Sequence, residues 1–368
     1  MNACRIVIIG GGAAGFFAAI ACKEANPFHS ITILEKNRQI LTKVKISGGG
    51  RCNVTHACFN PALLVKNYPR GGSVLRSAFA RFQPRDTVEW FAKRGVSLKI
   101  EKDGRMFPVT DSSSTIISLL SERARDLKVS IQLESSVDAI FKKESGSFDL
   151  CLSRNQSIDS STLECDIVLL ATGSHPYGHS LAESLGHRIV PCVPSLFSFT
   201  ISDSRLADLA GVSLADVNLR LQGISLRERG PLLITHSGLS GPAILRLSSW
   251  GARFLHEKNY QTSLVINWIP NYSEENIRKI FKEKRELSSS KMLASENLFE
   301  LPKSLWKKLV ASANIPEERL FAHFSKQEQE RFIQELLFCT FSMTGKSTHK
   351  EEFVTCGGVA LDQVEFKT

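Results

Sequence analysis

The sequence lacks any apolar run of the ~20 residues that a helix needs to cross a bilayer. Its first residues form a strand-like apolar stretch and not a charged region followed by a long apolar one, so we expect no secretory signal. The nine cysteines include no C-x-x-C pair and no His/Cys cluster with zinc spacing. We therefore expect a cytoplasmic protein with reduced thiols, no membrane contact and no metal.

Internal repeats and low-complexity tracts are also absent, and no second G-x-G-x-x-G motif follows a strand-like segment. The chain has 368 residues, of which 42% are hydrophobic, and its mean hydropathy is −0.07. This composition is typical of a globular chain with a large core. The length predicts two or three domains.

A glycine-rich motif lies at the N-terminus, between a predicted strand and a predicted helix. Gly10 permits a tight turn, Gly12 lets the backbone approach a pyrophosphate, and Gly15 lets helix and strand pack closely. The free N–H groups at the start of the helix can receive phosphates. Glu35 follows Gly15 by 20 residues, where a carboxylate can accept ribose hydroxyls. With its strand at 5–9, helix at 13–25 and strand at 30–34, the motif predicts dinucleotide binding.

Two further segments favour a ligand site. The loop from Ile46 to Thr55 contains three consecutive glycines, Gly48 to Gly50, which indicate unusual backbone conformations or close contact with a ligand. An ordinary linker is the alternative for this loop. The predicted strand over 166–170 ends in Ala171-Thr172-Gly173, as expected at the carboxyl edge of an α/β sheet.

The remaining chain alternates between helical and strand-like patterns. Helices are predicted at 73–82, 84–94 and 114–127, a hairpin at 96–107, and short strands between 129 and 170. Residues 190–268 have a β-like texture that one helix interrupts, starting at Gly241-Pro242. Residues 273–339 are helical and charged, with a capping box at Ser325 to Glu328, and residues 341–366 return to strands.

Charge is unevenly distributed along the sequence. Residues 36–105 hold 15 Lys and Arg against four Asp and Glu, a local net charge of +11, so the rest of the chain sums to −2. Such a stretch attracts phosphate groups, whether of a nucleotide cofactor or of RNA. A basic face that is merely solvated is the alternative.

Taken together, these motifs resemble the YhiN/BaiN family of bacterial FAD-dependent flavoproteins, within the glutathione-reductase-like flavin superfamily. The resemblance spans nearly the whole chain. It is carried by residues 7–15, by 46–55 (ISGGGRCNVT), 171–173 and 185–187, and by 235–245 (THSGLSGPAIL) and 354–359 (VTCGGV).

The resemblance implies an α/β fold in which a Rossmann-like FAD-binding domain is split by an inserted region. The FAD-binding domain would comprise residues 1–190 and 340–368. The inserted domain would comprise 191–339, β-rich over 191–272 and helical over 273–339. Related proteins have a longer glycine-rich stretch after the equivalent of Gly173, and they continue into a second flavin-binding segment. The C-terminal part of the FAD-binding domain is therefore expected to be incomplete.

The resemblance also implies site residues. The FAD-contacting candidates are Gly10, Gly12, Ala13, Ala14, Gly15, Glu35, Lys36, Gly50, Arg51, Cys52, Asn53, Thr172 and Gly173. Arg51 is the expected cation near the flavin ring, where it would stabilise the reduced form. Reduction of a C=C bond also needs a proton donor, for which His236, Cys52 and Tyr177 are candidates. A structural role is the alternative for each of these three residues.

The leading hypothesis is an FAD-dependent oxidoreductase that takes electrons from transiently bound NAD(P)H and reduces a conjugated C=C bond. The family is associated with two such substrates, a uridine in ribosomal RNA and a small enone. The basic segment and its interleaved aromatics favour RNA modestly, although aromatics at helical spacing are more often core; these are Phe59, Tyr68, Phe79, Phe82 and Trp90. The alternative is a vestigial flavin-fold module that binds RNA or protein and has lost stable FAD.

Overall fold

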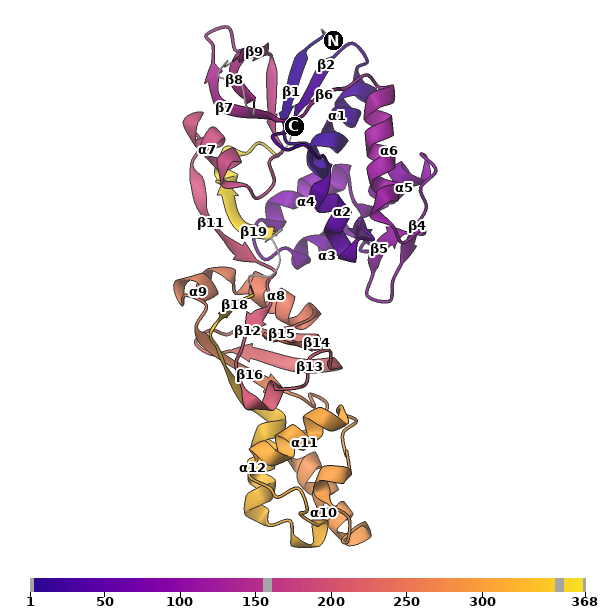
Figure 1. The fold of residues 1–368 in the computed structure, drawn as a ribbon, viewed down its shortest axis with the longest axis vertical. Coiled ribbons are helices and arrows are strands. Elements are labelled where there is room, and N and C mark those ends of the chain that lie inside the picture. The colour runs from indigo at the N-terminus through magenta and orange to yellow at the C-terminus, as the bar shows by residue number, and fades with distance from the viewer. Residues whose placement is uncertain (1–2, 155–160, 348–353, 367–368) are drawn as a thin grey trace. The chain divides into compact units, whose positions relative to one another are not determined.

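The computed structural model describes residues 3–154, 161–347 and 354–366. The chain forms two compact units (Figure 1). The first comprises Met1–Pro191 and Gly357–Thr368, and the second comprises Cys192–Cys356. The chain returns to the first unit at residue 357 and not at residue 340, where the sequence prediction placed the boundary. The reason is strand pairing: β17 (Cys339–Met343) pairs with β16 (Thr262–Asn267), which belongs to the second unit.

The first unit is built on a four-stranded parallel sheet. Its strands are β10 (Ile167–Leu170), β1 (Arg5–Ile9), β2 (Ser30–Leu34) and β6 (Ser130–Gln132), in this order. The register aligns Ile6 of β1 with Ile167 on one side and Ile31 on the other. A parallel sheet with a helix after its first strand is the Rossmann arrangement, so the predicted α/β class is confirmed.

The two faces of this sheet are covered differently. Helices α1 (Ala13–Ala25) and α6 (Ser113–Asp126) cover one face, where Ile6 and Ile8 pack with Phe16 and Leu120. An antiparallel sheet of β7 (Ser135–Lys142), β8 (Phe148–Arg154) and β9 (Ser161–Cys165) covers the other, where Val7 and Ile9 pack with Leu150. This coverage of both faces explains the nearly continuous apolar runs in β1 and β2.

Strand β10 lies at one edge of the parallel sheet. Because Ile167 and Leu169 are in register with Ile6 and Ile8, they point to the face that α1 covers. They are 47% and 37% exposed, whereas Ile8 is fully buried. Thus α1 covers the middle of this face and leaves its β10 side open.

The rest of the first unit consists of short elements. β3 (Thr55–His56), β5 (Arg105–Pro108) and β4 (Leu98–Ile100) form a small antiparallel sheet. The helices are α2 (Thr42–Ile46), α3 (Pro61–Leu64), α4 (Gly72–Arg81), α5 (Pro84–Ala92) and α7 (Pro176–Ser184). The predicted helices at 73–82, 84–94 and 114–127 and the hairpin at 96–107 are therefore confirmed, with ends shifted by one or two residues.

The second unit has a seven-stranded sheet with the order β17-β16-β13-β14-β15-β12-β18. Its strands beyond β16 and β17 are β12 (Phe199–Thr200), β13 (Ser213–Leu221), β14 (Arg227–Thr235), β15 (Gly238–Ser240) and β18 (Gly345–Lys346). Its helices are α8 (Pro242–Trp250), α9 (Ala252–Glu257), α10 (Glu274–Leu287), α11 (Lys303–Ser312) and α12 (Lys326–Leu337). Ser325 and Glu328 form the predicted capping box of α12. One core runs from the sheet into these helices and includes Trp268, Phe281 and Trp306.

A largely buried arginine joins three segments of the second unit. Arg205 pairs with Asp203 at 2.8 Å and with Glu335 of α12 at 3.0 Å, and it donates to the carbonyl oxygen of Thr340 in β17 at 2.6 Å. Its guanidinium also lies 4.1 Å from the ring centre of Phe341. Only 16% of the Arg205 side chain is exposed, so removal of its charge would leave two carboxylates with little solvent.

Two strands remain. β11 (Ile189–Ser195) and β19 (Val354–Val359) form a two-stranded sheet. None of the helices within the described ranges is long and apolar enough to cross a membrane.

Candidate functional site

A cavity of about 600 Å³ lies in the first unit, at the carboxyl ends of β1, β2 and β10. This is the edge at which open α/β sheets bind ligands. The lining residues come from five chain segments: Ile9–Ala14, Leu34–Asn37, Leu41–Val44, Ser135–Val137 and Leu170–Gly173, with His175 and Tyr177.

The three motif glycines have different spatial constraints. A Cβ atom at Gly10 would lie 2.4 Å from the carbonyl oxygen of Ala171, and one at Gly15 would lie 2.0 Å from that of Gly10. A Cβ atom at Gly12 would meet no protein atom within 4 Å. Gly10 and Gly15 are therefore needed for the packing of strand and helix, whereas the space beside Gly12 is open to a ligand.

The N-terminus of α1 faces this open space. Gly12 is the N-cap residue and provides no side-chain acceptor for the first N–H groups of the helix. Ala13 and Ala14 line the cavity. A pyrophosphate is the kind of acceptor that these donors and the positive end of the helix dipole favour.

Glu35 is almost fully buried and is held by hydrogen bonds. Its Oε2 accepts the backbone N–H of Gly11 at 2.8 Å, and its Oε1 accepts the backbone and side-chain N–H groups of Asn37 at 2.9 and 2.8 Å. The carboxylate thus fixes the glycine turn and keeps acceptor capacity at Oε2 for a ribose hydroxyl.

The cavity also has a cationic end. Nε2 of His175 lies 2.7 Å from Nζ of Lys36, and Nδ1 lies 3.2 Å from the backbone N of Tyr177. A neutral imidazole has one acceptor nitrogen, so it can accept only one of these two N–H groups. The other N–H group remains available to an anion. Burial, together with the charges of Lys36 and Lys43, holds the pKa of His175 below its ordinary value.

We expect a dinucleotide phosphate to reverse this shift. With no anion the lowered pKa keeps His175 neutral at pH 7, and a phosphate in the cavity favours the protonated ring because it adds a negative charge nearby. The pKa of His175, followed by NMR of its ring protons, should rise when ADP is added. The ring protons of His256, which lies in α9 of the second unit, serve as the control and should not change. An unchanged His175 pKa in the ADP-saturated protein would contradict a phosphate at this end.

Several residues that the sequence predicts as FAD contacts do not line this cavity. Arg51 forms an ion pair with Glu101 at 2.5 Å and its guanidinium lies 4.0 Å from the centre of the Phe107 ring. Asn53 is exposed, and neither residue lines the cavity. Gly50 lines a separate depression. In this structure the loop from Gly48 to Asn53 is therefore fixed against β5 and is not brought to the cavity.

The three candidate proton donors are also dispersed. Cys52 is buried in the core beneath α1, and burial raises the pKa of its thiol to about 11. Tyr177 lines the cavity, but its hydroxyl is buried and burial raises the pKa of the phenol. His236 is exposed in the turn between β14 and β15 of the second unit. Of the three, only Tyr177 belongs to the cavity.

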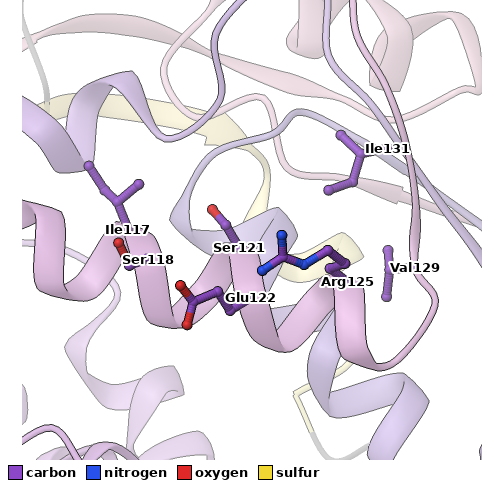
Figure 2. Close-up of a pocket in the computed structure, with 7 residues that line it drawn as sticks. All are labelled: Ile117, Ser118, Ser121, Glu122, Arg125, Val129 and Ile131. Carbon is purple, nitrogen blue, oxygen red and sulfur yellow. The ribbon is translucent and has the colours of Figure 1, made fainter.

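Two shallow depressions lie along α6. Figure 2 shows the smaller one, of about 480 Å³, with Ser121, Glu122 and Arg125 of α6 beside Ile131 of β6. The larger one, of about 910 Å³, shares Ile117, Ser118 and Ile131 with it and reaches Gly50. Neither depression has a His or Cys side chain in its lining, so we assign the site to the cavity at the sheet edge.

Sequence reasoning missed part of the cavity lining. Thr42 to Val44 and Ser135 to Val137 reach the cavity from the start of α2 and from β7. The sequence gives only a weak signal for α2, because this helix has five residues and lies directly before the glycine-rich loop. Among residues whose placement is described, no group of three or more His, Cys, Asp or Glu side chains could hold a metal ion.

The residues present fit a dinucleotide cofactor such as FAD. Phosphate chemistry is matched by the space beside Gly12, the free N–H groups of α1 and the cation of Lys36 beside His175. The oriented carboxylate of Glu35 matches a ribose. The apolar walls of the cavity, from Val44, Val137 and Leu170, suit a ring system.

The chain is similar to three enzymes. The ribosomal RNA dihydrouridine synthase of Escherichia coli (strain K12) is 28% identical over 375 residues, covering 98% of this chain and 87% of that protein. The enzyme of the same name from Haemophilus influenzae is 27% identical, with the same coverage. The 3-dehydro-bile acid delta(4,6)-reductase of Clostridium scindens is 29% identical, covering 75% of this chain and 67% of that protein.

These names describe reductive chemistry, in agreement with the predicted oxidoreductase. The HI0933-like protein Rossmann domain matches residues 4–368, which is nearly the whole chain. The family resemblance and the Rossmann-type cofactor domain are thus confirmed. The chain belongs to the HI0933-like family.

Proposed function

We propose that this protein is an FAD-dependent oxidoreductase that uses NAD(P)H to reduce a C=C bond conjugated to a carbonyl group. The observation that carries the proposal is the cavity at the sheet edge, which combines the glycine motif with Glu35 and a cationic end. The dihydrouridine synthases and the bile acid reductase among its relatives support the reaction class.

The first unit would hold the cofactor through its own residues. The N–H groups of Gly12, Ala13 and Ala14 would bind the pyrophosphate, and Glu35 would bind the ribose of the adenosine half. Lys36 and His175 would neutralise phosphate charge. The bound flavin would supply hydride chemistry to the site. NAD(P)H would bind transiently, since the sequence has one nucleotide-binding motif.

For the substrate we propose a uridine in RNA. Reduction of uridine to dihydrouridine adds two hydrogens across one conjugated C=C bond, which NAD(P)H and a proton supply. The similarity to the two dihydrouridine synthases covers 98% of this chain, and the basic residues of the first unit suit a polyanion. A small enone is the second candidate, supported by the similarity to the bile acid reductase.

The proposal is tested with the purified chain in two steps. Its visible spectrum is recorded before and after incubation with FAD, and we expect yellow protein that retains flavin through gel filtration. NADH and NADPH oxidation is then measured without oxygen, with ribosomal RNA or with a steroid enone as acceptor. RNA-dependent oxidation that yields dihydrouridine supports the full proposal, and enone reduction alone supports the second substrate. Colourless protein that FAD cannot reconstitute would contradict the function and favour a module without cofactor.

A further inference from the structure

Helix α4 differs from the other helices of nine or more residues in the described parts of the chain. Each of those buries at least two residues, whereas α4 buries none. It packs against α3 and the turn η2 (Val65–Asn67) in the first unit (Figure 1). Its exposed positions are Ser73, Arg76, Ser77, Ala80 and Arg81. This face is therefore basic, contains no carboxylate, and has short side chains that let a partner approach the helix.

The positive charge around this helix is not balanced by acidic residues of the same stretch: residues 66–85 contain five Lys and Arg and no Asp or Glu. Elsewhere in the range 36–105, five of the ten basic side chains form ion pairs with carboxylates: Arg38–Glu134, Arg51–Glu101, Arg94–Glu24, Lys99–Asp111 and Arg105–Asp103. No ion pair of Lys66, Arg76 or Arg85 is formed with any described residue. The acid closest in sequence, Asp86, is used to cap α5 through the N–H of Gln83. Residues 66–85, which we call the α4 segment, therefore keep a local net charge of +5.

Two partly exposed aromatic rings flank α4. Tyr68 is 39% exposed and packs on Phe79 with ring centres 5.6 Å apart, and Phe82 is 41% exposed and packs on Phe17 at 5.5 Å. Both rings are thus held in place from below and present surface to solvent. Rings of this kind, next to arginines, offer stacking sites for unpaired bases.

We propose that the α4 segment binds a single-stranded stretch of RNA. Its phosphates would contact Lys66, Arg76 and Arg85. Its bases would stack on the rings of Tyr68 and Phe82. Single-stranded RNA fits better than a duplex, because the bases of a duplex are not free to stack on the rings. It also fits better than a membrane surface, because the exposed face of α4 has no apolar side chain larger than that of Ala80. The inference rests on the proposed function for its RNA substrate and adds the surface that holds it.

The charge contribution is tested by a triple reversal, Lys66→Glu, Arg76→Glu and Arg85→Glu. Binding of a short fluorescein-labelled single-stranded RNA is measured by anisotropy over a range of salt concentrations. Each phosphate contact contributes ~0.7 to the log–log salt slope, so the slope should fall by about 2 and binding at low salt should weaken at least ~10-fold.

The matched control is Lys282→Glu, Lys303→Glu and Lys326→Glu. These three exposed lysines of the second unit form no ion pair with described residues, so the control changes the net charge equally. It should keep the parent salt slope. Equal weakening in both triple variants would overturn the proposal, as would binding to phosphatidylserine vesicles without binding to RNA.

The aromatic contribution is tested by Tyr68→Ala. Loss of one stacked base should weaken binding of single-stranded RNA by roughly 5- to 150-fold and leave duplex RNA unaffected. Equal loss for both RNAs, or none, would contradict the stacking role. Flavin retention is measured on every variant: if RNA binds as proposed to protein that cannot retain FAD, the proposed enzyme fails and the RNA surface stands.

Discussion

A Gly12→Val protein is expected to fold normally and to retain no FAD. A Cβ atom at residue 12 meets no protein atom within 4 Å, and the backbone angle φ of −89° is accessible to valine. The two methyl groups would therefore fill the space that a pyrophosphate needs at the start of α1. The apoprotein should lose no more than ~1 kcal/mol of stability, as for an unfavourable residue at an N-cap. The measurements are flavin content after gel filtration and a thermal melt of the apoprotein.

Gly15→Ala provides the contrasting control. Its Cβ atom would lie 2.0 Å from the carbonyl oxygen of Gly10, so the backbone of α1 or the glycine turn must shift. This variant should be destabilised in the presence and in the absence of FAD. If Gly12→Val folded and bound flavin as tightly as the parent, the cofactor would not lie on this motif.

The second large effect is expected in the second unit, for Arg205→Met. The change leaves Asp203 and Glu335 without their cation at sites where only 22% of each carboxylate side chain is exposed. Loss of one partner of such a pair destabilises a protein by about 3 kcal/mol. The loss of stability is measured by urea unfolding followed by tryptophan fluorescence. Three of the four tryptophans, Trp250, Trp268 and Trp306, lie in the second unit, and Trp90 lies in the first.

Arg278→Met is the matched control for Arg205→Met. Arg278 of α10 also pairs with two carboxylates, those of Glu274 and Glu330, but these side chains are 40% and 52% exposed. Exposed pairs contribute at most ~1 kcal/mol. If the two methionine variants lost equal stability, Arg205 would not hold its three segments together, and the core around Trp268 would carry that unit alone.

The elements around the glycine motif were predicted from the sequence at their observed bounds. β1, α1 and β2 lie at residues 5–9, 13–25 and 30–34, as expected. These bounds could be predicted because the turn, the helix and the strands are specified by local sequence: the glycines specify the turn, and the apolar periodicity specifies the helix and the strands. The position of Glu35 also follows from the sequence, since this residue comes directly after β2, the strand next to β1.

The loop from Gly48 to Asn53 could not be placed in this way. The residues that contact this loop lie about 50 positions further along the chain. Arg51 contacts Glu101 and Phe107, which the pairing of β3 with β5 brings close to the loop. The part of the cavity formed by β7 likewise depends on sheet order. Contacts between residues so far apart in the sequence have no local sequence signal. The prediction that the loop lies near the flavin came from the family resemblance alone and did not consider these contacts.

The open side of β10 has a consequence for the behaviour of the protein in solution. This four-residue strand pairs with β1 alone among described strands, so its other edge offers unpaired N–H and C=O groups. Ile167 and Leu169 add half-exposed aliphatic surface next to that edge. Such an edge is a template on which a strand of another polypeptide can align, and native proteins usually protect it with charge or proline. A lysine at residue 167 or 169 is therefore expected to reduce association through this edge in concentrated solutions.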